Sequence, residues 1–401
     1  MIFPSYSECE ECYHFQDDPD GVYTCTECHH TFCKQHSIQH TSETNHHEFQ
    51  HIEIPTNQSL LDESKNNVRG SMLAGFENLH NTCYFNSNLH VLFSISEFVN
   101  FCLSNECDKL GDLGHQLHRF VTAYHEGTRL FLRPSLLRKA IDVNAPQYLL
   151  PEPQDSIDFF NYLLSTLTQQ LPVEKSHLDL VQFNLIDEIT CHKCKQTFTV
   201  KNSNKQIPIQ FTEQSNPPFH AFVVKPQQRP EDYIEQSAQL NLDQLIDERC
   251  DFFFSNDPKS IKTDDQSQRV KCMNFTCPHC GCHEGNMKRK IEKAPKYLYV
   301  NVRLDHGSRD PDQRRKLRAL LQFDMNNFDI SRHVHEGNGK YQLLSFMHHT
   351  GKWAKWGHDI SYVRKEGSET LFVEFNDNVT REVNLQSYPF GRQYLYLFKQ
   401  I

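Results

Sequence analysis

The sequence predicts an α+β fold in which a helical half precedes a half built mainly from antiparallel strands, with a small zinc-binding domain in front of both. Three observations predict this order. Cysteines and histidines cluster before residue 55, apolar residues recur at helical spacing between residues 85 and 167, and short strand-like runs follow residue 181. A chain of 401 residues is long enough for two or three domains, one of them with a large core.

Composition narrows the class of protein. A formal charge of -10 argues against a nucleic-acid binder and suits a neutral or basic protein partner. We expect no signal peptide, because the first residues lack a basic region followed by an apolar run, and no membrane partner, because no run of about 18 apolar residues occurs. Fifteen cysteines, mostly in C-x2-C pairs near histidines, indicate metal in a reducing compartment, the nucleus or the cytoplasm.

Residues 1–55 are predicted to form a zinc-finger domain. Zinc takes four thiolate or imidazole ligands, and a C-x2-C pair supplies two of them from one turn. So few aliphatic residues occur here that the domain could hardly fold without metal, which disfavours a disordered arm with stray cysteines. Two zinc ions are therefore expected, with His47 and His51 as spare ligands. The eight candidate ligands are Cys9, Cys12, Cys25, Cys28, Cys33, His36, His40 and His46.

Residues 56–70 are polar, lack periodicity and read as a linker to a larger domain, residues 71–401. The first half of that domain is predicted to be helical. One apolar helical pattern runs from Phe85 to Val99, and others cover residues 110–124 and 134–141. Asp155 is placed to cap a further helix, and Asp158, three residues later, is placed to complete a capping box with it.

From residue 181 the pattern changes to strands, interrupted by a polar stretch over residues 212–239 that we interpret as an exposed insertion. Two C-x2-C pairs bracket this region and predict a zinc ribbon; a redox pair is the alternative. The ribbon ligands are Cys191, Cys194, Cys277 and Cys280, while Cys272 and Cys282 flank the second pair and leave its ligand choice open. The later strand-like runs cover residues 297–304, 341–347, 358–363, 371–375 and 394–398.

Cys83 is the candidate nucleophile. The apolar pattern that follows it predicts a helix starting at Cys83, where free backbone N–H groups favour a thiolate. A buried structural cysteine is the equally common alternative from this stretch alone. His358 begins a strand after a glycine-bearing loop and could serve as base, and Asn376 or Asp377 ends the next strand and could orient it. Cysteine, histidine and Asn/Asp follow each other in the order of papain-like cysteine proteases.

Four motifs in the larger domain resemble the ubiquitin-specific proteases. Residues 75–89 resemble their cysteine box, 341–358 with 375–377 their histidine box, 153–159 their glutamine-aspartate box, and the two C-x2-C pairs their fingertip zinc ribbon. The N-terminal cluster resembles the zinc finger that precedes the catalytic domain in many members, and a B-box finger has similar spacing.

This resemblance implies a papain-like catalytic domain over residues 71–401, with a helical thumb, a sheet palm and fingers at about residues 185–292. The reaction would be hydrolysis of the bond after the terminal Gly-Gly of ubiquitin in ubiquitinated proteins. Cys83 would be the nucleophile, His358 the general base and Asn376 the third member, with Asp377 as second choice or support. Asn78 and the Cys83 backbone N–H would stabilise the oxyanion.

Some positions depart from the family pattern. His80 stands where the family usually has glycine, so a positive φ there would be strained. His90 replaces a common glutamine, Asp359 an aromatic residue and Phe372 a tryptophan. None of these changes removes a catalytic group. The alternative is a weak or inactive ubiquitin-binding scaffold; a zinc hydrolase is disfavoured because each cluster has enough ligands to be closed.

The zinc finger also departs from its relatives. Lys34 and Gln35 follow Cys33 where ubiquitin-binding fingers carry a Gly-Arg stretch. This difference favours a finger that docks the protein into a multisubunit complex, as in histone-deubiquitinating members of the family, and leaves open whether the finger also binds ubiquitin.

Overall fold

The structure is a computed structural model. It separates into two compact units, residues 1–177 with 375–381 and residues 178–374 with 382–401. Each unit is described by itself. The described residues are 22–28, 31–46, 48–51, 74–126, 131–204, 207–210, 238–242, 246, 251–255, 270–272, 275–303, 305–307, 314–316, 319–350, 357–385 and 393–401. The predicted linker and most of the predicted insertion at 212–239 lie outside them.

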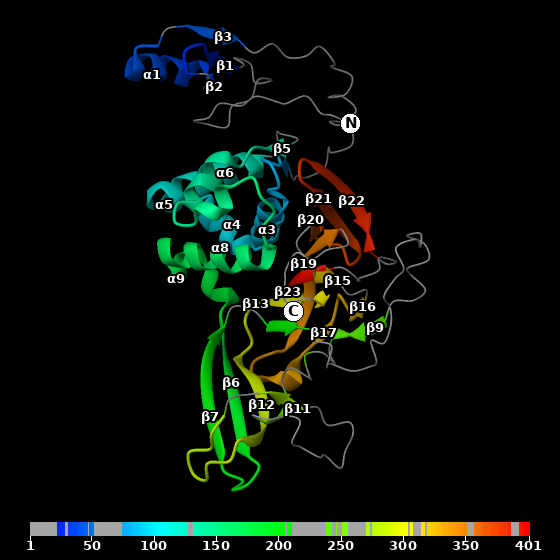
Figure 1. The fold of residues 1–401 in the computed structure, drawn as a ribbon. Helices are drawn as coiled ribbons and strands as arrows, with labels where there is room; N and C mark the ends of the chain where they lie inside the picture. The colour runs from blue at the N-terminus through cyan, green and yellow to red at the C-terminus, as the bar shows by residue number, and fades with distance from the viewer. Residues whose placement is uncertain are drawn as a thin grey trace. The chain divides into compact units, whose positions relative to one another are not determined.

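The N-terminal part of the first unit is a small sheet with one helix (Figure 1). Its elements are β1 (Val22–Cys25), β2 (Thr31–Cys33), α1 (Lys34–Thr44) and β3 (Phe49–His51). The strands are antiparallel in the order β2-β1-β3. Helix α1 ends at Asn45, whose φ of 66° is left-handed, and none of its residues is buried. A segment with so little apolar burial needs another source of stability.

The rest of the first unit is a group of helices with one short strand pair, drawn in cyan to green in Figure 1. The elements are β4 (Gly75–Phe76), α3 (Cys83–Phe93), α4 (Ser96–Cys102), α5 (Asn105–Asp108), α6 (Gly111–Glu126), β5 (Phe131–Leu132), α7 (Ser135–Asp142), η1 (Pro146–Leu149), α8 (Ser156–Gln170) and α9 (Val173–Ser176). All eleven residues of α3 are buried, so this helix forms the centre of the group.

The predicted helix from Phe85 to Val99 is wrong in one respect, because the structure divides it into α3 and α4. The Ser94 hydroxyl donates to the Val91 carbonyl at 2.6 Å, and Ile95 has an extended backbone that turns the chain before α4 starts. The helical spacing of apolar residues continues across this break because α3 and α4 both bury apolar side chains. The predicted cap of α8 is confirmed: the Asp155 carboxylate accepts from the N–H groups of Ile157 and Asp158.

The second unit is built mainly from strands, with two 3-10 turns, η2 (Leu178–Val181) and η6 (Ser331–His333). Residues 375–381, at the end of β21 and the start of β22, group with the first unit. The strands are β6 (Phe183–Cys191), β7 (Thr197–Asn204), β8 (Ile207–Gln210), β9 (Ala238–Asn241), β10 (Asp251–Ser255), β11 (Val270–Cys272), β12 (Glu284–Lys293), β13 (Tyr297–Arg303), β14 (Asp305–Gly307), β15 (Arg314–Lys316), β16 (Ala319–Gln322), β17 (Phe328–Asp329), β18 (Val334–Glu336), β19 (Lys340–Thr350), β20 (His358–Arg364), β21 (Leu371–Asn376), β22 (Val379–Asn384) and β23 (Gln393–Gln400). The later strands confirm the runs that the sequence predicted.

Two sheets dominate this unit (Figure 1). The eight-stranded sheet has the order β22-β21-β20-β19-β23-β13-β8, with β17 paired to β19, and its neighbours are antiparallel between β20, β19, β23 and β13. The six-stranded sheet has the order β11-β10-β12-β6-β7, with β18 paired to β12. Its two long strands are joined by a bidentate ion pair, in which Arg289 of β12 donates two hydrogen bonds of 2.6 Å to the Asp187 carboxylate of β6.

One face of the eight-stranded sheet carries a continuous apolar core. Leu298, Val300, Phe346, Tyr362 and Phe398 belong to it and are at most 2% exposed. Alternate residues of neighbouring strands contribute to this face, as expected for side chains with a period of two. This core fixes the sheet that contains β20, the strand that begins with His358.

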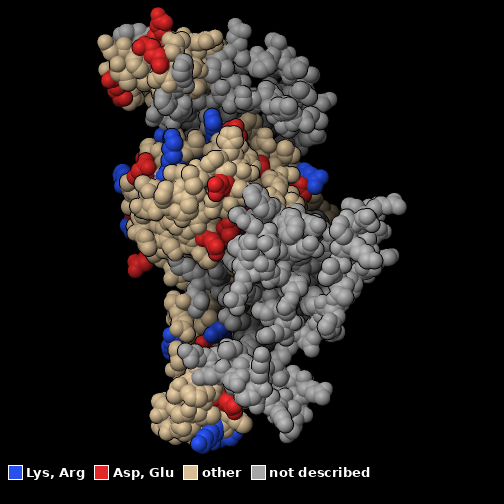
Figure 2. Space-filling model, viewed as in Figure 1, with Lys and Arg blue, Asp and Glu red and all other residues tan. Residues whose placement is uncertain are grey.

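Charged side chains are scattered over the visible face in small groups of both signs, and the largest blue group lies near the tip of the β6–β7 hairpin (Figure 2). Lys193 and Lys195 are exposed in that turn. Within the part of the chain that the structure describes, no helix is both long and apolar enough to span a membrane.

Candidate active site and metal clusters

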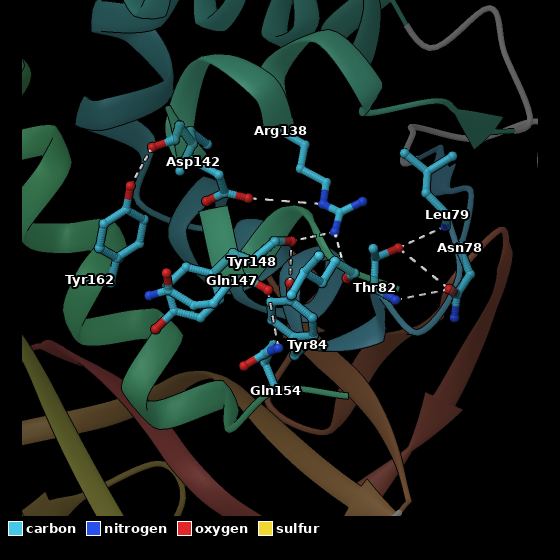
Figure 3. A network of polar contacts seen from close by, with 12 residues as sticks. Asn78, Leu79, Thr82, Tyr84, Arg138, Asp142, Gln147, Tyr148, Gln154 and Tyr162 are labelled. Carbon is cyan, nitrogen blue, oxygen red and sulfur yellow. Dashed lines mark hydrogen bonds and ion pairs between the residues drawn. The ribbon is translucent and has the colours of Figure 1, made fainter. Parts of the chain in front are cut away.

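Cys83 is the first residue of α3, as the apolar spacing predicted, and its side chain is buried. The loop before it is closed by its own hydrogen bonds (Figure 3). The Thr82 N–H donates to Asn78 Oδ1 at 3.0 Å, and the Thr82 hydroxyl oxygen accepts from the Leu79 N–H at 2.7 Å. Asn78 is thereby held beside the helix end at which Cys83 lies.

His80 and Asn81 adopt left-handed conformations in succession, with φ of 63° and 57°. Asparagine tolerates this region, and Asn81 is further held by a 3.1 Å bond from its amide to the Pro151 carbonyl. His80 is exposed, and within the described residues its side chain makes no comparable hydrogen bond. The positive φ foreseen for this position is therefore present in the loop.

Replacing His80 by glycine should stabilise this loop by about 1 kcal/mol, because glycine adopts a left-handed φ without the clash of a Cβ atom. Hydrogen exchange of the amides in the first turn of α3 measures the free energy of local opening. Asn81→Gly is the matched control and should lose stability, since it removes the bond to Pro151. An opening free energy that stays the same or falls in His80→Gly would show that His80 is not strained.

Asp377 connects the turn after β21 to the segment around Cys83. Its Oδ2 accepts from the Asn78 amide at 2.9 Å, and its Oδ1 accepts from the Asn86 amide at 2.8 Å. The backbone makes a third link, because the Phe76 N–H donates to the Asp377 carbonyl at 2.8 Å. Gly75 is required beside it, since a Cβ atom there would collide with that same carbonyl oxygen. We call these contacts the Asp377 latch.

The latch orients the Asn78 amide. Its oxygen is used by Thr82, and one of its N–H groups is used by Asp377. An amide nitrogen carries two hydrogens, so a second donor remains, and the Asn78 side chain is exposed enough for a ligand oxygen to reach it. This is the arrangement that an oxyanion donor needs.

Asn376 ends β21 and groups with the first unit. Phe375 before it stacks on one face of His90 and Phe76 stacks on the other, each with ring centroids 3.9 Å apart. Burial holds the pKa of His90 well below its usual value, so this imidazole is neutral. His90 of α3 thus packs as a neutral aromatic ring between Phe76 and Phe375, the residue that precedes Asn376.

His358 begins β20 in the second unit and is partly exposed. The Thr350 hydroxyl donates to its carbonyl at 3.1 Å. Gly357 before it packs so closely that a Cβ atom would collide with the Thr350 carbonyl and the His349 ring. Of the residues predicted for catalysis, Cys83, Asn78, Asn376 and Asp377 therefore belong to the first unit and His358 to the second.

The N-terminal domain brings four of its predicted ligands together. The ligand atoms of Cys25, Cys28, His40 and His46 all lie within 4.8 Å of one another. Cys33 and His36 form a separate pair, with Sγ 3.3 Å from Nδ1. Two further predicted ligands, Cys9 and Cys12, lie outside the described residues.

The second cluster joins the two C-x2-C pairs of the second unit. The sulfurs of Cys191, Cys194, Cys277 and Cys280 lie within 4.8 Å of one another. Cys282 is not part of this set, because its Sγ donates to the Glu284 carbonyl at 3.7 Å. The side chain of Cys272 lies outside those that the structure describes.

Both clusters fit zinc. Burial raises the pKa of the Cys191 thiol, but the backbone N–H groups of Cys194 and Lys193 point at its sulfur and bring the pKa down to about 6. In the first cluster the pKa of Cys25 is lowered in the same way, against its burial, by the N–H groups of Cys28 and Glu27. Neighbouring sulfurs act the other way on Cys194 and Cys280, whose pKa values are raised, so the case for zinc rests on the two sets of four close thiol and imidazole groups, which are the ligands of structural zinc.

Sequence reasoning missed the residues that support the site. Thr82, Asn86 and Arg138 make contacts that hold the Cys83 segment, yet none carries a recognisable catalytic pattern. Asn86 could have been recognised as a supporting residue, because a polar side chain on a buried apolar helix needs hydrogen-bond partners. Its amide donates to the carbonyls of Phe76 and Glu77 and to the Asp377 carboxylate. Thr82 and Arg138 offered no such signal.

Comparisons with known proteins agree with this description. A family model described as ubiquitin carboxyl-terminal hydrolase matches residues 74–398, and one described as variant UBP zinc finger matches residues 6–55. Ubiquitin carboxyl-terminal hydrolase 4 of Arabidopsis thaliana is 22% identical over 350 residues, which are 80% of this chain and 88% of that protein. Ubiquitin carboxyl-terminal hydrolase 46 of Caenorhabditis elegans is 21% identical over 370 residues, 81% of this chain and 83% of that protein.

Other matches are narrower or concern the fold. Ubiquitin carboxyl-terminal hydrolase 8 of Arabidopsis thaliana is 24% identical over 130 residues, 31% of this chain but only 14% of that protein. A solved structure of the SAGA DUB module, with Ubp8, Sgf11, Sus1 and Sgf73 bound to monoubiquitin, matches with a TM-score of 0.61 and 14% identity, covering 98% of this chain and 89% of that one. The predicted fold class and the predicted structural zinc are thereby confirmed. The chain belongs to the ubiquitin carboxyl-terminal hydrolase family.

Proposed function

We propose that the chain is a thiol-dependent deubiquitinase that cleaves the peptide or isopeptide bond after the C-terminal glycine of ubiquitin. The observation that carries this proposal is the Asp377 latch, which fixes an exposed amide, that of Asn78, beside the helix end where Cys83 lies. A nucleophile and a preorganised oxyanion donor from one rigid loop are what acyl transfer requires.

In the proposed reaction His358 takes the Cys83 proton, and the thiolate sulfur attacks the glycine carbonyl carbon. The carbonyl oxygen becomes an oxyanion that accepts from the Asn78 amide and the Cys83 N–H. The C–N bond then breaks as His358 returns the proton to the leaving amine, which leaves a thioester. Water activated by His358 hydrolyses the thioester and restores the thiol. Asn376 orients the imidazole, and Asp377 acts on Asn78.

Zinc has a structural role in this proposal. The first cluster offers two thiols and two imidazoles, and the second offers four thiols. Four protein ligands complete the tetrahedron of zinc, so neither set leaves a position at which zinc could activate water. The chemistry is therefore assigned to the cysteine, histidine and amide side chains.

Partner binding is proposed for the N-terminal domain. Ile38 on α1 is 67% exposed, and the helix has no buried residue, so one of its faces is available for a protein surface. The similar solved structure is a module of several chains bound to monoubiquitin. We propose that this domain docks the enzyme into a multisubunit complex in the nucleus or cytoplasm. A pull-down in which deletion of residues 1–55 leaves the partner set unchanged would refute this role.

The activity is tested with ubiquitin carrying a C-terminal electrophile. We expect wild-type protein to be labelled once per chain under reducing conditions, and Cys83→Ala to stay unlabelled. Cys282→Ala is the matched control and should be labelled like wild type, because Cys282 lies outside the zinc cluster. Wild-type protein that stays unlabelled both alone and with its partners, or Cys83→Ala that is still labelled, would overturn the proposal. Binding without labelling would instead support the scaffold alternative, to which strain at His80 lends weight.

A further inference from the structure

The chain from the end of α7 to the first residue of α8 is hydrogen-bonded to the Cys83 segment at three points. The Asn81 amide donates to the Pro151 carbonyl at 3.1 Å, the Tyr84 hydroxyl to the Tyr148 carbonyl at 3.0 Å, and the Asn88 amide to the Ser156 carbonyl at 3.0 Å. These three donors stand two residues before, one residue after and five residues after Cys83. The loop is therefore hydrogen-bonded to the start of α3 on both sides of Cys83.

Arg138 adds a charged donor to this contact (Figure 3). It comes from α7 and is 8% exposed. Its Nη2 donates to the Tyr148 carbonyl and, at 3.3 Å, to the Leu150 carbonyl. The Tyr148 carbonyl thus accepts from both Arg138 and Tyr84, and a hydrogen bond from a charged donor is about twice as strong as one between neutral groups.

Asp142 provides the counter-charge one helical turn away. Its Oδ2 lies 3.9 Å from Arg138 Nε, and the side chain is fully buried. Within the described residues, neither of its oxygens accepts a hydrogen bond. Burial raises the pKa of this carboxyl to about 7, against the pull of Arg138. The other titratable groups close to it are the phenols of Tyr84, Tyr148 and Tyr162, so Arg138 is the one cation that affects it in this part of the structure.

A buried arginine without a counter-charge would be strongly destabilising, and a buried carboxylate without hydrogen bonds is costly as well. Hydrophobic packing alone would keep the loop in place at lower cost, since Tyr148 already packs on Phe159 and Tyr162 with centroids 5.0 and 4.9 Å apart. What the ion pair adds is a fixed direction for the guanidinium, with Nε toward Asp142 and Nη2 toward the loop carbonyls.

We propose that Arg138, oriented by the Asp142 carboxylate, is a positioning residue for the reaction: it holds the Tyr148 carbonyl on the Tyr84 hydroxyl and so fixes the turn of α3 that begins with Cys83. This role rests on the proposed function of Cys83. In this role Arg138 does not touch the substrate. It acts through Tyr148 and Tyr84 on the orientation of the thiol.

The test compares Arg138→Met with Arg138→Lys, which keeps the charge but not the forked geometry. The control is Lys175→Met, which removes one cation from an exposed ion pair with Glu106 in the same unit. Two readouts are measured: kcat and KM for a fluorogenic ubiquitin substrate, and the rate at which iodoacetamide alkylates Cys83 as a function of pH, followed by mass spectrometry of the Cys83 peptide.

We expect Arg138→Met to lower kcat about tenfold or more with KM within about twofold, and to change the pH profile of Cys83 alkylation. Arg138→Lys should fall between it and wild type, and Lys175→Met should match wild type. A normal alkylation profile in folded Arg138→Met, whatever its kcat, would overturn the positioning role. A loss of kcat that only matches the fraction of unfolded Arg138→Met protein would also overturn the positioning role.

Two milder variants keep the test decisive if Arg138→Met does not fold. Tyr84→Phe deletes only the hydroxyl that shares the Tyr148 carbonyl, and combined with Arg138→Lys its effect on kcat should be less than additive. Asp142→Asn should flatten the change in the alkylation profile between pH 6 and 8, where the carboxyl titrates. Additive effects together with an unchanged profile in Asp142→Asn would refute the inference. The alkylation measurement uses no ubiquitin. It therefore tests the positioning role of Arg138 even if the wild-type protein hydrolyses no ubiquitin conjugate and the proposed function fails.

Discussion

Replacing Cys28 by serine should unfold the N-terminal domain and release one zinc ion per chain. Cys28 is one of four ligand residues whose donor atoms lie within 4.8 Å of one another. Among the described residues of this domain, α1 buries no side chain, and the buried apolar residues are Val22, Phe32 and the cysteines Cys25 and Cys33, which make a small core. Zinc binding contributes about 10–16 kcal/mol in small zinc-finger peptides, more than such a core supplies.

Metal content measured on the purified protein, together with hydrogen exchange over residues 22–51, checks this expectation. Exchange should become fast throughout the domain in Cys28→Ser, while the helices of residues 83–126 keep their protection. Cys282→Ser is the control, since it also removes a thiol but leaves both clusters intact. If Cys28→Ser kept its full zinc content and its protection, the four-residue cluster would not be the metal site.

Replacing Asp377 by alanine should lower kcat by about 10²–10³-fold, the loss typical of removing one oxyanion-hole donor. The carboxylate accepts from the amides of Asn78 and Asn86, so its loss frees the first and leaves the second buried with fewer partners. KM should change much less, because the Asn78 contact is made most strongly in the transition state. Steady-state kinetics with a fluorogenic ubiquitin substrate measures both constants.

Asp377→Asn retains one acceptor oxygen and should lose less activity than Asp377→Ala. Asn378→Ala alters the neighbouring side chain of the same turn and should behave like wild type. A kcat within about threefold of wild type in folded Asp377→Ala would show that Asn78 keeps its orientation without the latch, and that its contribution comes from Thr82 alone.

The elements of this protein were largely predictable because local patterns determine them. The strand-like runs at residues 341–347 and 394–398 and the cap at Asp155 depend on near neighbours in the sequence, and each is present in the structure. The break between α3 and α4 was not predictable from apolar spacing, since it is made by a serine hydroxyl competing for a backbone carbonyl.

For the candidate site, the sequence predicted the proposed reactive groups but not the residues that support them. Cysteine, histidine and amide residues are recognisable because few side chains can perform their chemistry. The supporting contacts are different, because they join residues far apart in the chain and no local pattern reports them. Asn78 and Asp377 are separated by 299 positions, and Tyr84 and Tyr148 by 64. Arg138 resembles any helical surface arginine in the sequence, and only the fold shows that it is buried.

The latch also has a consequence for the order in which the protein matures. The first unit is complete only with residues 375–381, which are synthesised some 300 positions after the loop that they fix. During translation the helices around Cys83 can assemble early, but Asn78, Asn86 and the Phe76 N–H must wait for their partner turn. A nascent chain therefore carries Cys83 long before it can form the contacts that hold the Asn78 amide, because their partner turn, residues 375–381, is synthesised last of the parts of the first unit.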